Sequence, residues 1–168
     1  TRKGNFDSMH RVDGHPGKCR NIHGHTYLYE IQIQVPDNNV VGYELDFAVL
    51  KSIISQYIDG YLDHTSILNP ADKDIIELCK QNNYKYYEMS LYGDGKYCNP
   101  TAENISIEMF IALDELLVNT TASVSNVRLY ETPNCYVDFN NKPLKGWPAF
   151  KKSKKLKTII NEIRNLNK

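Results

Sequence analysis

The chain has 168 residues, 41% hydrophobic and 24% charged, with a formal net charge of zero and a pI near 6.9. This length suits one domain with a core of its own, and the neutral charge gives no general case for binding nucleic acid. Because the sequence shows neither a signal-peptide pattern nor the roughly 20 apolar residues of a membrane span, we expect a cytoplasmic protein without a membrane partner.

The N-terminal part of the chain predicts two strands joined by a loop. Residues 2–9 are expected to form the first strand, with His10 at its end. Residues 11–22 contain two glycines and a proline and are expected to form a loop. Residues 25–35 alternate apolar and polar side chains, as a half-buried strand does. A turn cluster beginning at Pro36 ends this second strand.

The middle of the chain is expected to be mainly helical. Asp46 is a suitable N-cap for a helix over residues 47–61, whose apolar positions follow the i, i+3, i+4, i+7 rule. A shorter helix is expected over 72–82, and a strand followed by a loop over the tyrosine-rich residues 84–99. Thr101 is expected to cap the longest helix, at 102–118.

Two strands and a basic segment complete the predicted order. Residues 124–130 and 135–139 are expected to form a hairpin around a Thr-Pro-Asn turn. Strands that flank a run of helices favour an α+β fold with the helices on one face of an antiparallel sheet. We expect a single catalytic domain over 1–150, followed by a basic C-terminal helix or tail over 151–168. That tail carries a run of lysines: Lys151, Lys152, Lys154, Lys155 and Lys157.

Residues 10–25, HRVDGHPGKCRNIHGH, hold four of the five histidines. His23 and His25 project from one face if they lie on the second strand, because strand side chains repeat every two residues. His10, at the end of the neighbouring strand, would supply a third ligand, as in catalytic zinc sites with three protein ligands and one open position. His15 is the expected non-ligand, although it could replace His10.

Cys19 lies between the candidate ligands and is flanked by Lys18 and Arg20. Neighbouring cations and a metal favour the thiolate, which is the form that acts as a base or nucleophile. Cys19 could instead be a fourth ligand of a closed structural site. The proton-handling pair Asp63 and His64 favours the open alternative. The four cysteines form no CxxC pair, so neither a zinc knuckle nor a thioredoxin motif is supported. Without a secretory signal they are expected to be reduced thiols.

Six short motifs follow one another over most of the chain. They are Phe6 with His10, Cys19 with His23-Gly24-His25, Asp46-Phe47, Leu62-Asp63-His64, Pro100-Thr101-Ala102-Glu103-Asn104 and Glu131-Thr132. Together they resemble the 6-pyruvoyltetrahydropterin synthase superfamily, which includes the 6-carboxytetrahydropterin synthases. The resemblance implies a tunnelling fold (T-fold) with a four-stranded antiparallel sheet in ββααββ order. It also implies homo-oligomers, trimers stacked as hexamers, with active sites at subunit interfaces.

The same resemblance implies a role for each candidate residue. His10, His23 and His25 would hold Zn²⁺, and the Cys19 thiol would accept a proton. Asp63, His64 and Glu131 would relay protons and anchor the pterin. Thr101 would be a further contact to the pterin. A carboxylate suits this substrate because it accepts two parallel hydrogen bonds.

Three residues separate Cys19 from His23, which is similar to the 6-carboxytetrahydropterin synthases of queuosine-type 7-deazaguanine biosynthesis. The expected enzyme is a lyase that converts 7,8-dihydroneopterin triphosphate to 6-carboxy-5,6,7,8-tetrahydropterin, acetaldehyde and triphosphate. The alternatives are a 6-pyruvoyltetrahydropterin synthase, a zinc-stabilised binding domain whose basic tail engages nucleic acid, and a related aldolase or cyclohydrolase. The last is disfavoured by the HGH pair with Asp63 and His64. Residues 69–99 and the tail after Trp147 are additions to the compact family pattern.

Overall fold

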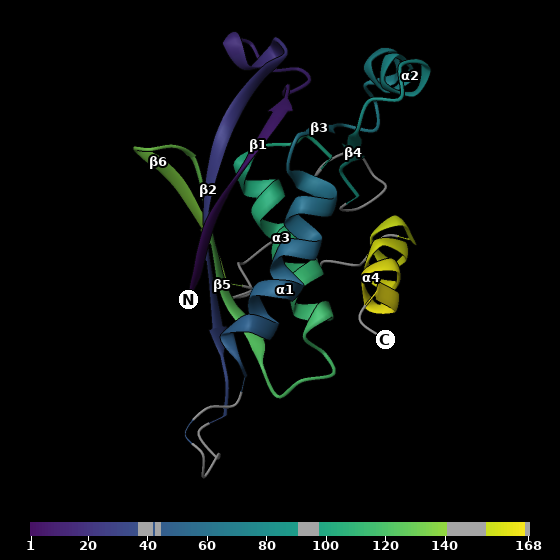
Figure 1. The fold of residues 1–168 in the computed structure, drawn as a ribbon. Helices are drawn as coiled ribbons and strands as arrows, with labels where there is room; N and C mark the ends of the chain where they lie inside the picture. Colours follow the sequence, from purple (N-terminus) through teal and green to yellow (C-terminus); the bar gives the residue numbers. More distant parts are fainter. Residues whose placement is uncertain (37–41, 43–44, 91–97, 141–153, 167–168) are drawn as a thin grey trace.

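The computed structural model describes residues 1–36, 42, 45–90, 98–140 and 154–166. They form an α+β fold in which one mixed sheet has the strand order β4-β3-β1-β2-β5-β6. Figure 1 shows the long helices on one side of this sheet, as predicted. The strands are β1 (Arg2–His10), β2 (His23–Gln34), β3 (Thr65–Leu68), β4 (Tyr86–Glu88), β5 (Ser123–Thr132) and β6 (Cys135–Phe139). The α-helices are α1 (Phe47–Tyr57), α2 (Lys73–Gln81), α3 (Ala102–Leu116) and α4 (Lys154–Leu166).

The centre of the sheet is the antiparallel pair β1 and β2. Their register places Phe6 opposite Tyr27, and the two rings stack with centroids 5.1 Å apart. Alternate residues of β2, among them Tyr27, Tyr29 and Ile31, are buried against the helices. The period-two pattern of the sequence therefore correctly predicted which face of β2 is internal, and the histidines lie on that same face.

The sheet differs from the predicted four-stranded antiparallel arrangement because it contains two further strands. β3 pairs in parallel with β1, and β4 pairs in parallel with β3. β3 was not predicted, because its four residues are nearly all buried and show no alternation of apolar and polar side chains. The hairpin of β5 and β6 was predicted and is confirmed.

The helices begin where their caps predicted. The Asp46 carboxylate accepts a hydrogen bond from the Ala48 amide at 2.6 Å, and the Thr101 hydroxyl accepts one from the Asn104 amide at 3.3 Å. The first helix is shorter than predicted: α1 ends at Tyr57 and continues as a π-helical turn over Ile58–Leu62. This turn ends immediately before Asp63, so it sets the position of the acid–histidine pair.

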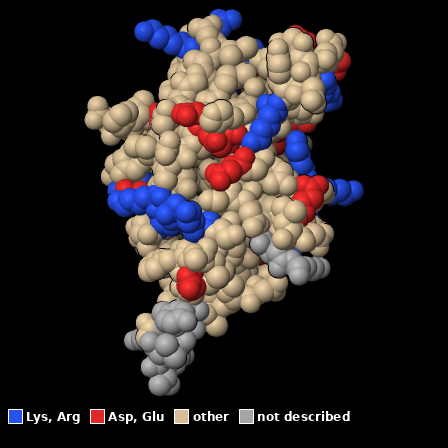
Figure 2. Space-filling model, viewed as in Figure 1, with Lys and Arg blue, Asp and Glu red and all other residues tan. Residues whose placement is uncertain are grey.

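The C-terminal helix α4 is part of the core. Four of its side chains are buried with those of α1 and α3: Leu156, Ile159, Ile160 and Ile163. Its Lys155 ammonium lies 3.4 Å from the Glu88 carboxylate on β4. Figure 2 shows basic and acidic side chains interspersed on this face of the molecule. Over the described ranges, no helix is both long and apolar enough to cross a membrane.

Candidate metal centre and active site

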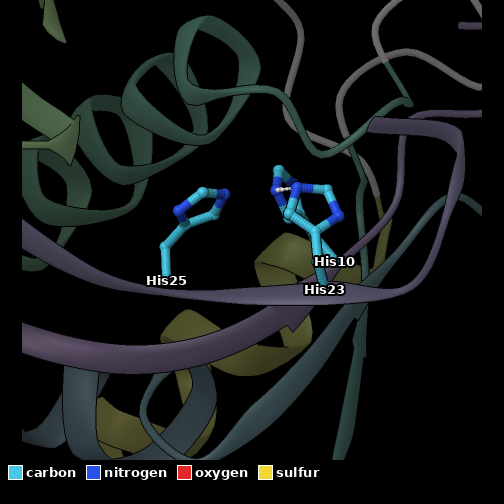
Figure 3. A group of neighbouring side chains, drawn as sticks. All are labelled: His10, His23 and His25. Carbon is cyan, nitrogen blue, oxygen red and sulfur yellow. Dashed lines mark hydrogen bonds between the residues drawn. The ribbon is translucent and has the colours of Figure 1, made fainter. Parts of the chain in front are cut away.

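His10, His23 and His25 converge at one end of the β1–β2 pair (Figure 3). The antiparallel register places His10 directly opposite His23, and His25 follows two residues later on the same face of β2. One nitrogen from each ring lies within 4.8 Å of the others. The sequence-based prediction that these three side chains meet is confirmed.

The hydrogen bonds of two rings fix which nitrogen faces the centre. His10 Nδ1 lies 2.6 Å from the Pro100 carbonyl oxygen, and His23 Nδ1 lies 2.7 Å from the Asn21 carbonyl oxygen. A carbonyl only accepts, so each Nδ1 carries the proton and each Nε2 presents a lone pair. The two Nε2 atoms are 3.1 Å apart, close to the about 3.3 Å between two ligands of a tetrahedral zinc with Zn–N distances of 2.0–2.1 Å.

The third ring and a nearby carboxylate complete the centre. His25 Nε2 is buried and has no hydrogen-bond partner in the part of the chain that the structure describes. Glu131 Oε1 lies 3.6 Å from this atom and 3.4 Å from His10 Nε2. Two inward lone pairs and a third buried ring nitrogen without a hydrogen-bond partner are costly to bury unless a cation is present. The residues present therefore fit a divalent metal bound by three imidazoles.

Burial favours the neutral form of His10 and His25, which is the form that binds a metal. Burial lowers the pKa of His10 to about 4, against the opposing effect of its hydrogen bond to the Pro100 carbonyl; neighbouring His23 and His25 lower it further. Burial also lowers the pKa of His25, although the Glu131 carboxylate raises it. His10 and His25 can therefore stay unprotonated below the ordinary histidine pKa of 6.5.

The metal-free protein is expected to lose stability as the pH falls from 6.5 towards 4. In this window the unfolded chain protonates His10 while the folded chain does not, so the unfolding free energy falls by up to about 3 kcal/mol. The lowered pKa values of Asp63 and Asp138 act only below their ordinary 3.8, outside this window. Urea unfolding of chelator-treated protein at about pH 7 and about pH 5 measures the difference. Equal stability at both pH values would contradict it.

Cys19 lies outside the group of three metal-binding histidines. It sits in a short 3-10 turn, Lys18–Arg20, and its side chain is partly buried. Its carbonyl accepts a hydrogen bond from the Val12 amide at 2.7 Å. Among the described residues, the group able to hold a metal contains the three histidines and not this thiol. The geometry thus favours the open site over the closed one.

Asp63 and His64 form a hydrogen-bonded pair beside Asp7 of β1, three residues before His10. Asp63 Oδ2 lies 2.7 Å from His64 Nδ1, and Asp63 Oδ1 accepts a hydrogen bond from the Asp7 amide at 2.9 Å. Burial raises the pKa of Asp63, but these two hydrogen bonds and the charges of His64 and Lys85 outweigh it and leave that pKa lowered. The carboxylate therefore stays ionised and orients the imidazole.

His64 is 79% exposed and adopts a left-handed backbone conformation with φ of 51°. It lines a shallow groove of about 770 Å³ that His25 also borders. Within one chain the described contacts of His64 are with Asp63 and Asp7, and no contact joins it to the metal-binding histidines. Within the described residues of one chain, therefore, His64 shares this groove with His25 but does not contact the metal centre.

Two contacts of the site were missed by sequence reasoning. The Pro100 carbonyl orients His10, and the side chain of Asn99 bonds to the backbone of the loop that carries Cys19. Neither has a distinctive sequence signal, since a carbonyl has no residue signature and an asparagine before a helix cap is common. Thr101, predicted as a pterin contact, caps α3 one residue after Pro100.

Comparisons with known proteins place most of the chain in one group. Residues 1–142 match the family model described as 6-pyruvoyl tetrahydropterin synthase. A Rickettsia felis protein named 6-carboxy-5,6,7,8-tetrahydropterin synthase is 37% identical over 142 residues, which cover 82% of this chain and 96% of that protein. A Dictyostelium discoideum protein named 6-pyruvoyl tetrahydrobiopterin synthase is 27% identical over 147 residues, covering 82% and 91%. The structure of Caenorhabditis elegans 6-pyruvoyl tetrahydropterin synthase matches with a TM-score of 0.59 and 25% identity, over 84% of this chain and 93% of that one.

Proposed function

The chain belongs to the 6-pyruvoyl tetrahydropterin synthase family, and on that premise we propose that it is a zinc-dependent 6-carboxy-5,6,7,8-tetrahydropterin synthase. The T-fold expected from the sequence motifs is confirmed by this membership and by the matching solved structure. The proposed reaction is a lyase reaction in which 7,8-dihydroneopterin triphosphate and water give 6-carboxytetrahydropterin, acetaldehyde and triphosphate. The carboxy product is favoured because the relative with that name is 37% identical, against 27% for the pyruvoyl-type relative.

The observation that carries the proposal is the convergence of three imidazole nitrogens beside Glu131. His10, His23 and His25 would hold Zn²⁺, which when bound acts as a Lewis acid that polarises oxygen atoms of the substrate side chain. Two of the three rings are already oriented by carbonyl groups that fix their tautomers.

The remaining groups would bind the pterin and move protons. The Cys19 thiolate would remove a proton from the substrate side chain. His64, oriented by the Asp63 carboxylate at 2.7 Å, would return a proton elsewhere. The Glu131 carboxylate, which is 33% exposed, would accept two parallel hydrogen bonds from the ring N–H and the 2-amino group. Thr101 would be a further pterin contact.

The exposure of His64 supports a homo-oligomer. Its side chain is accessible and touches no metal-binding histidine of its own chain, as expected when the active site is shared between subunits. We therefore propose a trimer or hexamer. Cys19, Cys79 and Cys135 are free thiols, which supports a cytoplasmic location. We propose 7-deazaguanine (queuosine-type) biosynthesis as the pathway of the product.

Incubation of the zinc-loaded protein with 7,8-dihydroneopterin triphosphate is expected to release acetaldehyde in step with 6-carboxytetrahydropterin. Acetaldehyde can be followed with a coupled alcohol dehydrogenase, and the pterin by chromatography. Protein stripped with a chelator is the control and should regain activity when Zn²⁺ is restored. Formation of 6-pyruvoyltetrahydropterin without acetaldehyde would identify the alternative product, and no turnover of this substrate would refute both.

A further inference from the structure

The side chain of Asn99 ties the loop over residues 11–22, which carries Cys19, to the rest of the molecule. Asn99 Nδ2 donates to the Asp13 carbonyl oxygen at 2.9 Å, and Asn99 Oδ1 accepts from the Asp13 amide at 3.1 Å. A side-chain amide that satisfies both polar groups of one residue's backbone reproduces the pairing of two antiparallel strands. This two-bond arrangement fixes the orientation of the loop as well as its distance.

The backbone of Asn99 is anchored at the metal centre. Its carbonyl accepts hydrogen bonds from the Thr101 amide and from Asn104 Nδ2, both at 2.9 Å, at the beginning of α3. The next residue, Pro100, accepts the hydrogen bond of His10 Nδ1. The side chain of Asn99 therefore extends from the same backbone segment that orients a metal-binding histidine.

The hydrogen bonds continue from Asp13 to the thiol segment. Val12, the neighbour of Asp13, donates its amide to the Cys19 carbonyl at 2.7 Å. Two steps thus connect the Asn99 amide to the backbone of Cys19. The longest helix or strand within the loop is a three-residue 3-10 turn, so little regular structure holds Cys19 in place independently of Asp13. A displacement of Asp13 would therefore be transmitted to the thiol.

The segment after β3, which the sequence marked as an addition, supports this arrangement from the outside. Asn69 Nδ2 donates to Asn99 Oδ1 at 2.8 Å. Arg11 Nε donates to Asp72 Oδ1 at 2.8 Å, and Asp72 is 2% exposed. Asn69 therefore braces Asn99, and Asp72 braces Arg11 at the start of the loop.

We propose that Asn99 is a positioning residue that holds Cys19 at the working distance from the metal-bound substrate. The inference rests on the proposed function, in which Cys19 is the proton acceptor. It assigns a task to the added segment as well: Asn69 keeps the Asn99 amide in the orientation in which its oxygen faces the Asp13 amide.

The test compares the variants Asn99→Ala and Asn99→Asp with the unaltered zinc-loaded protein. Asn99→Ala removes both bonds to Asp13, whereas Asn99→Asp keeps the shape and the acceptor but loses the donor. Iodoacetamide labelling, resolved for each cysteine by peptide mass spectrometry, reports on Cys19 without any need for turnover. We expect labelling of Cys19 to be several-fold faster in Asn99→Ala, because a braced, partly buried thiol becomes freely accessible. We expect kcat to fall on the order of tenfold or more, with KM and zinc content nearly unchanged.

Internal and matched controls separate positioning from loss of folding. Cys135 is exposed on β6 and Cys79 is buried on α2, so the labelling rates of both should stay constant. Asn82→Ala removes an asparagine side chain that donates to the Leu78 carbonyl at the end of α2, and it should behave as the unaltered protein does. Unchanged Cys19 labelling and kcat in both Asn99 variants, or faster labelling of Cys79 together with Cys19, would overturn the proposal. If the unaltered protein lacks lyase activity, selective labelling of Cys19 still decides the role of Asn99.

Discussion

Replacement of Cys19 by alanine is expected to lower turnover of dihydroneopterin triphosphate by roughly 10²–10⁴-fold, the usual contribution of a general acid or base. The bound metal should stay at the level of the unaltered protein, because the ligand group consists of three histidines and excludes this thiol. Steady-state kinetics and zinc analysis on the same preparation measure the two quantities. The expected signature is a loss of kcat with full metal content.

Cys135→Ala is the matched control for this variant. Cys135 is an exposed thiol at the start of β6, outside the metal centre, and its removal should leave both kcat and zinc content unchanged. Loss of zinc from Cys19→Ala would instead support the closed site, in which the thiol is a fourth ligand and the metal has a structural role.

Replacement of His25 by alanine is expected to abolish both metal retention and activity. Two imidazoles would remain, and a site with two ligands holds zinc far more weakly than the three-histidine sites of zinc enzymes. His25 suits this test because its side chain is 21% exposed, whereas that of His10 is fully buried. Truncation of His25 should therefore disturb the core less. The zinc that remains after dialysis against a weak chelator should fall from about one per chain to near zero.

His15→Ala controls for the effect of removing any histidine from this loop. His15 Nδ1 accepts a hydrogen bond from the Gly17 amide at 2.9 Å and is not among the three converging rings. This variant should retain its zinc. If His15→Ala lost the metal and His25→Ala retained it, the assignment of the ligands would be contradicted. His15 would then be a metal ligand.

The core of the metal site could be predicted from the sequence because a strand repeats every two residues. The spacing of His23 and His25 places both rings on one face, and the position of His10 at the end of the preceding strand brings it opposite. The contact of Glu131 with the centre could not be derived in this way. It depends on how β5 pairs with β2, which is a long-range register that local patterns do not specify.

The missed parts of the fold and site have the same physical origin. β3 is recognised only through its parallel pairing with β1, and a buried run of four residues has no periodicity of its own. The turn Ile58–Leu62 continues the apolar pattern of α1, so the sequence does not indicate the change from α to π geometry. The role of Asn99 depends on two backbone atoms of Asp13, and residue types alone do not predict contacts with backbone atoms.

The buried face of α4 has a consequence for where this chain can be truncated. The family match ends at residue 142, yet four side chains beyond it, Leu156, Ile159, Ile160 and Ile163, are packed in the core. At about 1.5–3 kcal/mol for each buried aliphatic side chain, their removal would rival the whole net stability of a domain, about 5–15 kcal/mol. Helix α4 therefore folds cooperatively with the rest of the domain, although it lies beyond the residues that match the family. A chain truncated at residue 142 is therefore expected to unfold. Charge changes on the exposed lysines of α4 should leave the core intact.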